Sequence, residues 1–208
     1  MNRPSVVRSV RLGLLLGIHA FSSSVLVAGD TTDWTQWRGP HRTGKIEVAP
    51  WPDKLGGDRL QQLWRVELDA SYSGPLVTAD RVFVTETRNK KTEHVQALDR
   101  ATGKSLWEAS WSGSISVPFF AKANGDWIRS TPAIDGDSIF VAGIRDVVVC
   151  LDINTGRERW RVDLMEKFKA PSPAFGFVAS PLVMGNHVFV QAGGGFVKLD
   201  KTTGEVVW

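Results

Sequence analysis

Apolar residues in this chain come in short runs that alternate with glycine, proline, asparagine and aspartate. Short runs bounded by turn-forming residues favour β-strands over helices. Strands are predicted over residues 82–85, 139–142 and 188–191, and each follows a shorter strand that begins at a proline. We find no convincing amphipathic helix after the first 29 residues. The pattern therefore predicts an all-β chain built from repeated units of four short strands.

A motif of eleven residues occurs three times, as ALDRATGKSLW at 97–107, CLDINTGRERW at 150–160 and KLDKTTGEVVW at 198–208. Every copy keeps Leu-Asp, Thr-Gly and a final Trp at the same spacing. A second element precedes each copy, in which a proline and a phenylalanine stand eight residues apart. The residues that we assign to the motif are Ala97, Asp99, Thr102, Gly103, Trp107, Cys150, Asp152, Thr155, Gly156, Trp160, Asp200, Thr203, Gly204 and Trp208.

Tryptophans mark the period of the repeat. Trp64, Trp107, Trp160 and Trp208 follow one another at separations of 43, 53 and 48 residues, a period typical of four-stranded propeller blades. Aspartate and threonine can bond the backbone N–H groups of a turn, and glycine supplies a positive φ, so the turn should be rigid. A tryptophan buried against it removes roughly 150–250 Å² from water, or about 4–6 kcal/mol of gross transfer free energy. We expect this contact to hold neighbouring blades together.

These motifs resemble those of the pyrroloquinoline-quinone-like (PQQ-like) β-propeller repeat family, over about residues 63–208. The resemblance implies a quinoprotein-type β-propeller with four-stranded antiparallel blades. Each motif tryptophan is then expected to stack between the first-position alanine and the peptide at the glycine of an adjacent motif. Cys150 and Lys198 stand in the alanine place of the second and third copies.

The family resemblance also implies about eight blades, near the upper end of the usual range for propellers. The chain is therefore expected to be an N-terminal fragment, with about three blades of an incomplete ring. In that case the last tryptophan, Trp208, should dock on a blade beyond the sequence given. We expect it to be substantially more exposed than Trp107 and Trp160.

Three parts of the chain are predicted. Residues 1–29 combine three arginines, a short apolar stretch and small residues, as a cleavable secretory signal peptide does. We therefore expect export to the periplasm or the extracellular space. Residues 30–62 contain Trp-Arg-Gly-Pro at 37–40, resemble the opening of exported PQQ-like repeat proteins from planctomycete-type bacteria, and are expected to pack on the propeller. Residues 63–208 should form the blades.

The charge and the cysteine content of the chain limit the classes of partner that we expect. The chain has 25 Lys and Arg against 22 Asp and Glu, and three of the arginines lie in the signal. The remaining chain is close to neutral, so no nucleic-acid or anionic-lipid partner is expected. The apolar stretch of the signal is short and broken by serines, which argues against a stable membrane anchor. Cys150 is the single cysteine, so no intrachain disulfide is expected, and the oligomeric state is left open.

The resemblance raises a quinoprotein alcohol dehydrogenase as an alternative. Such an enzyme implies PQQ and Ca²⁺ at the ring centre, a disulfide between adjacent cysteines, a stacking tryptophan and an aspartate base. Cys150 has no neighbouring cysteine and is interpreted as filling the alanine place of its motif. The motif aspartates recur in every unit, which favours a role in turns over catalysis. No histidine pair has metal-ligand spacing, so no catalytic, cofactor-binding or metal-binding residue is assigned.

Loop length varies most between the units. From a docking tryptophan to the next proline the chain advances 11, 25 and 21 residues in turn. The two longer inserts are rich in aromatic residues and should gather on one face of the ring, either to cover the blade ends or to bind a partner or ligand. The residues of this possible interaction face are Trp111, Phe119, Phe120, Trp127, Phe168, Phe175 and Phe177.

These features favour an exported, non-catalytic scaffold of the bacterial envelope that binds protein partners. In architecture the chain resembles BamB, although no lipid-attachment cysteine lies near the signal. Two alternatives stay open, namely part of a PQQ-dependent alcohol dehydrogenase and the extracytoplasmic sensor propeller of a larger protein. A propeller fold hosts many functions, so the sites must decide between them.

Overall fold

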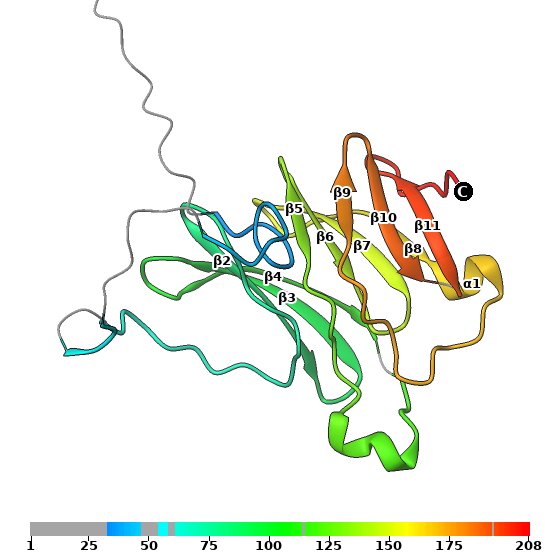
Figure 1. The fold of residues 1–208 in the computed structure, drawn as a ribbon, viewed down its shortest axis with the longest axis horizontal. Coiled ribbons are helices and arrows are strands. Elements are labelled where there is room, and N and C mark those ends of the chain that lie inside the picture. The colour runs from blue at the N-terminus through cyan, green and yellow to red at the C-terminus, as the bar shows by residue number, and fades with distance from the viewer. Residues whose placement is uncertain (1–32, 47–53, 58–60, 114, 193) are drawn as a thin grey trace, which may run out of the picture.

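Three antiparallel sheets stand side by side in an open arc (Figure 1). The computed structural model describes residues 33–46, 54–57, 61–113, 115–192 and 194–208. The expected signal peptide and part of the segment 30–62 lie outside the described residues. The strands are β1 (Leu76–Val77), β2 (Arg81–Arg88), β3 (Thr92–Asp99) and β4 (Ser105–Ser112), then β5 (Ala133–Asp135), β6 (Ser138–Ala142), β7 (Val147–Asp152) and β8 (Glu158–Asp163), and finally β9 (Leu182–Met184), β10 (His187–Ala192) and β11 (Gly195–Asp200).

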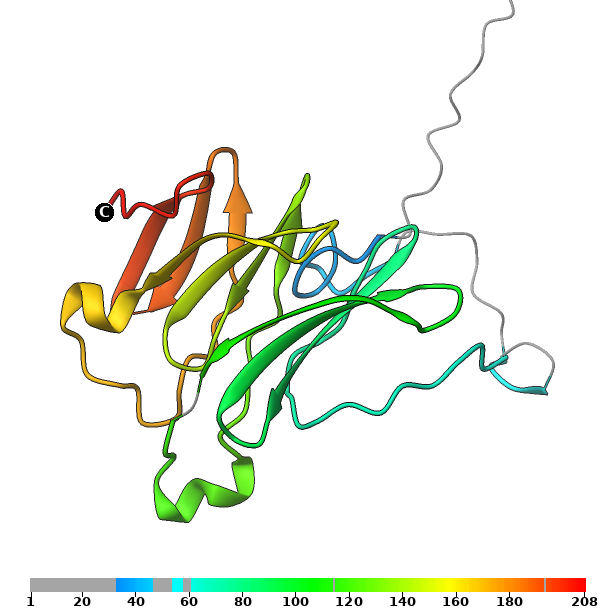
Figure 2. The same ribbon diagram turned by 180° about the vertical axis from the view of Figure 1, so that it is seen from behind.

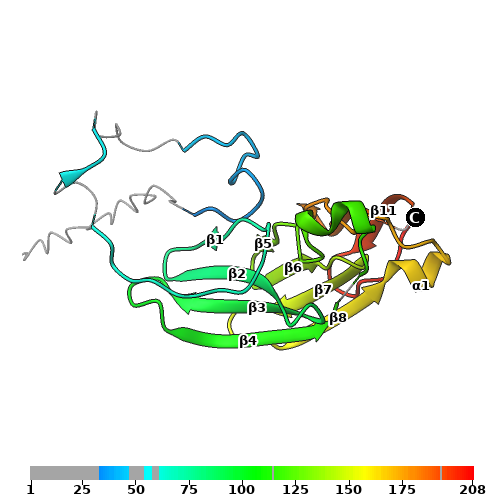
Figure 3. The same ribbon diagram turned by 90° about the horizontal axis from the view of Figure 1, so that it is seen from below.

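Within each sheet the strands follow one another in chain order, in the orders β1-β2-β3-β4, β5-β6-β7-β8 and β9-β10-β11. The prediction of an all-β, blade-like fold is confirmed, and the three predicted strands at 82–85, 139–142 and 188–191 fall inside β2, β6 and β10. Seen from behind and from below, the sheets fan out with their first strands on one side and their last strands on the other (Figures 2 and 3).

Two features differ from the sequence prediction. The inserts contain short helices, η2 (Phe119–Asn124) and α1 (Leu164–Phe168), where no helix was expected. Asp163 caps α1, because its side chain accepts a bond from the Glu166 N–H. In the third unit the expected fourth strand is reduced to a single bridge between Leu199 and Val206.

Each motif turn is bonded as the sequence predicts. Asp99 Oδ1 accepts bonds from the Thr102 backbone N–H and hydroxyl, both at 2.7 Å. The Gly103 N–H donates to the Asp99 carbonyl, and Gly103 has a φ of 71°. The second and third turns repeat these bonds through Asp152 and Asp200. The aspartate and glycine thus fix the turn before any contact with a neighbouring blade is made.

Each motif glycine lies under the indole of the preceding unit. A Cβ on Gly156 would clash with the ring of Trp107, and a Cβ on Gly204 would meet Trp160 at 2.6 Å. The indole N–H of Trp107 also donates to the carbonyl of Ile153 at 3.0 Å. Burial of the ring therefore leaves no unsatisfied polar atom, which is what a buried tryptophan requires.

The same docking recurs along the arc. Trp160 donates to the Lys201 carbonyl at 2.9 Å, and Trp64 donates to the Arg100 carbonyl at 2.8 Å. Trp64 lies over Gly103 although residues 61–69 form no sheet strand in the structure. It therefore occupies the place that the last strand of a preceding blade would supply.

The third motif tryptophan docks on no motif glycine among the described residues. Trp208 is 56% exposed, whereas Trp107 and Trp160 are 9% and 8% exposed, so the expected difference in exposure is confirmed. The strands β4 and β8 carry the docked tryptophans near their beginnings and continue past them, whereas the chain leading to Trp208 forms one bridge. Docking on the next blade thus accompanies completion of the fourth strand.

Two buried clusters fill the spaces between the three sheets. The phenylalanine of each second element packs against the tryptophan of its own blade. Ring centroids lie 5.9 Å apart for Phe83 and Trp107, and also for Phe140 and Trp160. Trp107 pairs with Ala97 across β3 and β4, and Trp160 pairs with Cys150 across β7 and β8. The indoles of Trp107 and Trp160 are therefore each packed between their own blade on one side and the motif glycine of the next blade on the other.

The segment 33–46 crosses the first strands of the sheets. Trp34 exchanges two backbone hydrogen bonds with Val77 of β1, and the carbonyl of Thr35 accepts a bond from the Ile134 N–H of β5. Arg42 Nη1 lies 3.4 Å from the carbonyl of Pro181, just before β9. The segment thus contacts all three blades, and Figure 3 shows it on the side of β1 and β5, away from β4 and β8.

Alanine at Gly156 tests whether the blades depend on the close approach of the indole. Gly156 and Gly136 have φ values of 70° and 59°, but only a Cβ on Gly156 would meet another group. We expect Gly136→Ala to lower the free energy of unfolding by about 1 kcal/mol, through backbone strain alone. Gly156→Ala should lower it by about 3 kcal/mol or more, because the clash adds to the strain. Urea denaturation measures both, and equal losses would show that docking does not need this contact.

Candidate functional site

Three aromatic side chains from the two long inserts meet on one side of the arc, beyond the edges of the sheets. Phe119 and Phe120 lie in η2, and Phe175 lies in the chain between α1 and β9. The ring centroids of Phe119 and Phe120 are 5.6 Å apart, and those of Phe120 and Phe175 are 6.3 Å apart. Their exposed fractions are 82%, 71% and 47%. We call these three residues the aromatic patch, and η2 marks its place below the sheets in Figure 1.

Four other residues named for the interaction face lie elsewhere. Trp111 and Phe177 are buried, so neither can meet a partner directly. Trp127 packs on Tyr72, with ring centroids 5.7 Å apart. Phe168 ends α1 and is about half exposed, without a ring contact to any described residue. The inserts therefore supply both a surface patch and part of the core.

Glu93 is fully buried where the first blade meets the second, and it was not among the residues expected from the sequence. Its carboxylate accepts the indole N–H of Trp111 at 2.7 Å and the backbone N–H of Ile144 at 2.6 Å. A Cβ on Gly113 or Gly143 would collide with it. Burial raises the pKa of Glu93, and the two N–H donors and Arg145 oppose that rise.

A raised carboxyl pKa can mark a catalytic acid. Glu93, however, is closed off from solvent by the groups that it bonds, so no substrate can reach it. It is better described as a link that joins β3, β4 and the turn before β7. A sequence signal existed, because Glu93 stands six residues before Asp99 and Asp146 stands six residues before Asp152. Asp146 is buried as well.

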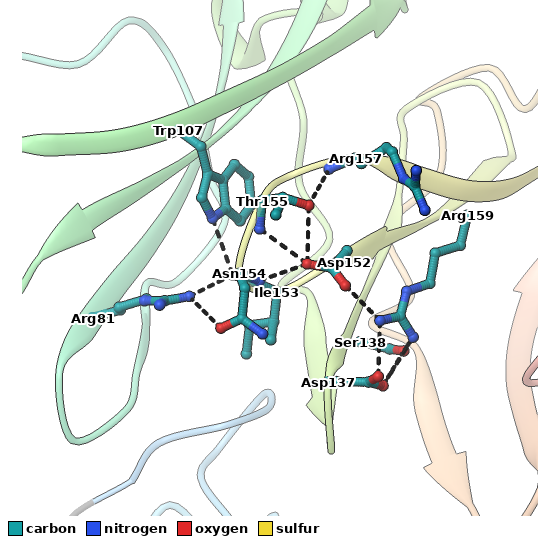
Figure 4. Close-up of polar contacts among 10 residues, drawn as sticks. All are labelled: Arg81, Trp107, Asp137, Ser138, Asp152, Ile153, Asn154, Thr155, Arg157 and Arg159. Atoms are coloured by element: carbon teal, nitrogen blue, oxygen red, sulfur yellow. Dashed lines mark hydrogen bonds and ion pairs between the residues drawn. The ribbon is translucent and has the colours of Figure 1, made fainter.

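The second motif turn makes polar contacts within its own blade and with the first blade (Figure 4). Arg159 donates to Asp137 and to Asp152 at 2.8 Å and 2.6 Å. From the first blade, Arg81 Nη1 donates to the Ile153 carbonyl at 2.8 Å, beside the indole bond from Trp107. The arginine and the turn bonds lower the pKa of Asp152 to about 2.

Reactive groups are scarce in the described part of the chain. Cys150 is buried and its pKa is raised to about 11 by loss of solvation, so its thiol stays protonated and a poor nucleophile. Among the residues that the structure describes, no group of His, Cys, Asp and Glu side chains is arranged to hold a metal ion. Over the same residues, no helix has the length and apolar character needed to cross a membrane.

Comparison with known proteins agrees with this architecture. The family model described as outer membrane protein assembly factor BamB matches residues 57–118 and 91–208. The serine/threonine-protein kinase AfsK of Streptomyces griseus is 29% identical over 154 residues, which make up 71% of this chain and 17% of the kinase. BamB of Kangiella koreensis is 29% identical over 136 residues, or 64% of this chain and 30% of that protein. The chain thus spans less than a third of either relative.

A solved structure of a quinohemoprotein shares the blade architecture. The quinohemoprotein alcohol dehydrogenase ADHIIG from Pseudomonas putida HK5 superimposes with a TM-score of 0.50 and 19% identity, covering 70% of this chain and 21% of the enzyme. BamB from Moraxella catarrhalis gives a TM-score of 0.45 and 22% identity, covering 66% of this chain and 35% of that protein. Identities this low speak for the fold alone.

Removing the Arg159 guanidinium should release the carboxylate of Asp152. We expect Arg159→Gln to raise the Asp152 pKa from about 2 toward the ordinary value near 3.9, as measured by NMR titration of the side-chain carboxyl. A carboxyl with a lowered folded-state pKa stabilises the fold above its unfolded pKa, and this stabilisation is lost as pH falls through the folded value. The variant should therefore lose the stability that the wild type loses between about pH 4 and pH 2. Arg157→Gln, a neighbouring substitution, should leave the Asp152 pKa unchanged.

Replacing Glu93 by glutamine should weaken the joint between the first two blades. A glutamine has one acceptor oxygen for two N–H donors, so its NH₂ group faces one donor and leaves it unsatisfied. We expect the free energy of unfolding to fall by about 1–3 kcal/mol. Glu108→Gln removes a half-exposed carboxylate that pairs with Arg88 and should cost about 1 kcal/mol or less.

The difference in stability between the wild type and Glu93→Gln should also depend on pH. An acid whose folded-state pKa is raised contributes stability below its unfolded pKa, near 4.3, and loses it as pH rises through the folded value. Glutamine does not titrate, so the gap between wild type and Glu93→Gln should narrow with rising pH. A gap that widens over that interval would contradict the raised pKa of Glu93.

Proposed function

Because the chain belongs to the outer membrane protein assembly factor BamB family of PQQ-like propeller repeats, we propose that it is a non-catalytic envelope scaffold that binds a protein partner through the aromatic patch. The family association supports a propeller of periplasmic or envelope-associated type. Export by a signal peptide belongs to the proposal. The observation that carries the proposal is the exposure of Phe119 and Phe120 on a short helix that extends away from the blades.

Exposed aromatic clusters are costly on a protein surface unless something covers them. Aromatic residues also carry much of the binding energy at protein interfaces. Phe119 and Phe120 come from the insert before β5, and Phe175 comes from the insert before β9. The patch is therefore assembled only when the second and third blades are docked, which gives a partner a defined surface to recognise.

A dehydrogenase would need PQQ and Ca²⁺, and the described residues do not fit that pair. The one cysteine is buried and has no neighbouring cysteine. No described set of carboxylates and imidazoles is arranged around a metal position. The buried carboxylate of Glu93 is held by an indole and a backbone N–H. We therefore derive no reaction step through a quinone.

A second function is favoured by one comparison. A protein named as a serine/threonine-protein kinase matches 71% of this chain but only 17% of its own length. A propeller of this type can therefore form part of a larger protein that also carries a kinase. If this chain is the sensor region of such a protein, the aromatic patch would bind the signal partner rather than an assembly partner.

Site-specific photocrosslinking in cells tests the proposal. A photoreactive amino acid is placed at Phe120 in the full protein, and at Leu106 as a control, since Leu106 is half exposed at the start of β4 and does not belong to the patch. We expect one defined protein adduct from position 120 and none from position 106. The adduct should disappear with Phe119→Ser, which should change the free energy of unfolding little because Phe119 is exposed.

Two results would overturn the proposal. The first is the same set of adducts from both positions, which would show that the patch has no specific partner. The second is dye-linked alcohol oxidation by the purified full protein on addition of PQQ and Ca²⁺, which would show that it is an enzyme.

A further inference from the structure

The residues just before the first strands differ between blades although their positions in the repeat correspond. Tyr72, Arg129 and Val178 each stand three residues before the proline that begins a unit. The motif residues, by contrast, are nearly the same in every unit. A position needed to build each blade should recur, so a position that changes is free to serve a site that is needed once.

These three positions converge on one cavity of about 340 Å³. Trp37 and Arg42 of the segment 33–46 complete its wall. We call this cavity the axial pocket; its lining residues belong to the segment 33–46 or stand just before the first strands β1, β5 and β9. Its lining contains two guanidinium groups, two aromatic rings and no carboxylate.

Hydroxyl groups at the floor of the axial pocket are arranged as donors. The Gly74 N–H of the first blade donates to Thr131 Oγ1 of the second at 3.1 Å, and the Thr131 N–H donates to Ser180 Oγ of the third at 3.0 Å. Each oxygen thus already accepts a bond from a backbone N–H. Neither hydroxyl proton is donated to any acceptor among the described residues, so both remain available to a ligand.

Arg42 is held in place but only partly bonded. It stacks on Trp37, with the guanidinium carbon 5.3 Å from the ring centroid. Its Nη1 makes long bonds of 3.3 Å to Gln36 and 3.4 Å to the Pro181 carbonyl, whereas Nε and Nη2 donate to nothing that the structure describes. Burial lowers the pKa of Arg42. The remaining guanidinium N–H groups can therefore donate to a ligand carboxylate, because no carboxylate lines the pocket.

In a second cavity of this protein, the cationic side chains are paired with carboxylates. It is lined by Asp135, Asp137, Arg159 and Lys201 among others. There, each cation bonds a carboxylate, Arg159 to Asp137 at 2.8 Å and Lys201 to Asp135 at 2.6 Å. In the axial pocket, by contrast, Arg42 bonds no carboxylate among the described residues, and hydroxyl donors stand beside it.

We propose that the axial pocket binds a carboxylate, seated against Arg42 and the hydroxyls of Thr131 and Ser180 beside the ring of Trp37. A guanidinium fork matches the planar geometry of a carboxylate. The aromatic walls would cover the apolar part that carries the carboxylate. The carboxylate comes either from an acidic peptide side chain or from a free small acid, and both present the same group to the pocket. This inference does not depend on the aromatic patch.

Ligand titration of the full protein, followed by NMR of the Trp37 indole N–H, tests the proposal. The probes are the blocked peptide acetyl-Gly-Leu-Glu-Gly-amide, its glutamine counterpart, succinate and inorganic phosphate. We expect the glutamate peptide or succinate to bind, and the glutamine peptide not to bind. Binding of the glutamate peptide would identify a peptide as the source of the carboxylate, and binding of succinate would identify a small acid.

The chain offers a matched pair of arginine variants. Arg38 and Arg42 both stack on Trp37, at 5.5 Å and 5.3 Å, but only Arg42 lines the pocket. Arg42→Gln should weaken carboxylate binding about tenfold or more, and Arg38→Gln should leave it unchanged. The proposal is overturned if no carboxylate binds, if the glutamine peptide or phosphate binds as tightly, or if both variants behave alike. Loss of crosslinking at Phe120 would not affect this result, so the two proposals fail separately.

Discussion

The contact of an indole with the glycine of the next blade holds this arc together. It combines burial of a large apolar ring with a hydrogen bond from the indole N–H to a turn carbonyl, made by Trp107 to Ile153 and by Trp160 to Lys201. Glycine is required twice at each docking position, for its positive φ and for the absence of a Cβ under the ring. Every other feature of the fold depends on this spacing. The inserts can meet, and the segment 33–46 can bridge three blades, only because the blades stand at fixed distances.

Polar groups between the blades make that spacing specific. An apolar interface tolerates small sliding movements, but the bonds of Glu93 to Trp111 and to Ile144 restrict the first joint to one register. A buried carboxylate is costly to desolvate and is retained only where its bonds are complete. Gly113 and Gly143 leave the space in which those bonds form. Within this joint, apolar docking supplies most of the stabilisation and the carboxylate fixes the geometry.

The sequence predicted the features that repeat and missed those that occur once. The strands and the aspartate turns follow from local patterns present in every copy, so three copies reinforce one interpretation, and the exposure of Trp208 follows from the docking contact that the family resemblance implies. The helices η2 and α1 occur once each and span only six and five residues, too few for a periodic pattern. Phe119 and Phe177 belong to similar aromatic inserts, yet one is exposed and the other buried. That difference is decided by contacts between blades, such as the bond from the Phe177 N–H to the Ile144 carbonyl, which no local pattern encodes.

The aromatic patch and the axial pocket both take residues from the two long inserts. Phe175 of the aromatic patch stands three residues before Val178 of the axial pocket, and the insert that holds Phe119 and Phe120 ends at Arg129 and Thr131. A partner that moves either insert would therefore act on both regions. The docked blades restrict how far the inserts can shift, because Tyr72, Arg129 and Ser180 sit directly before strands anchored in the sheets. The sheets therefore serve as the fixed frame on which the patch and the pocket are both built.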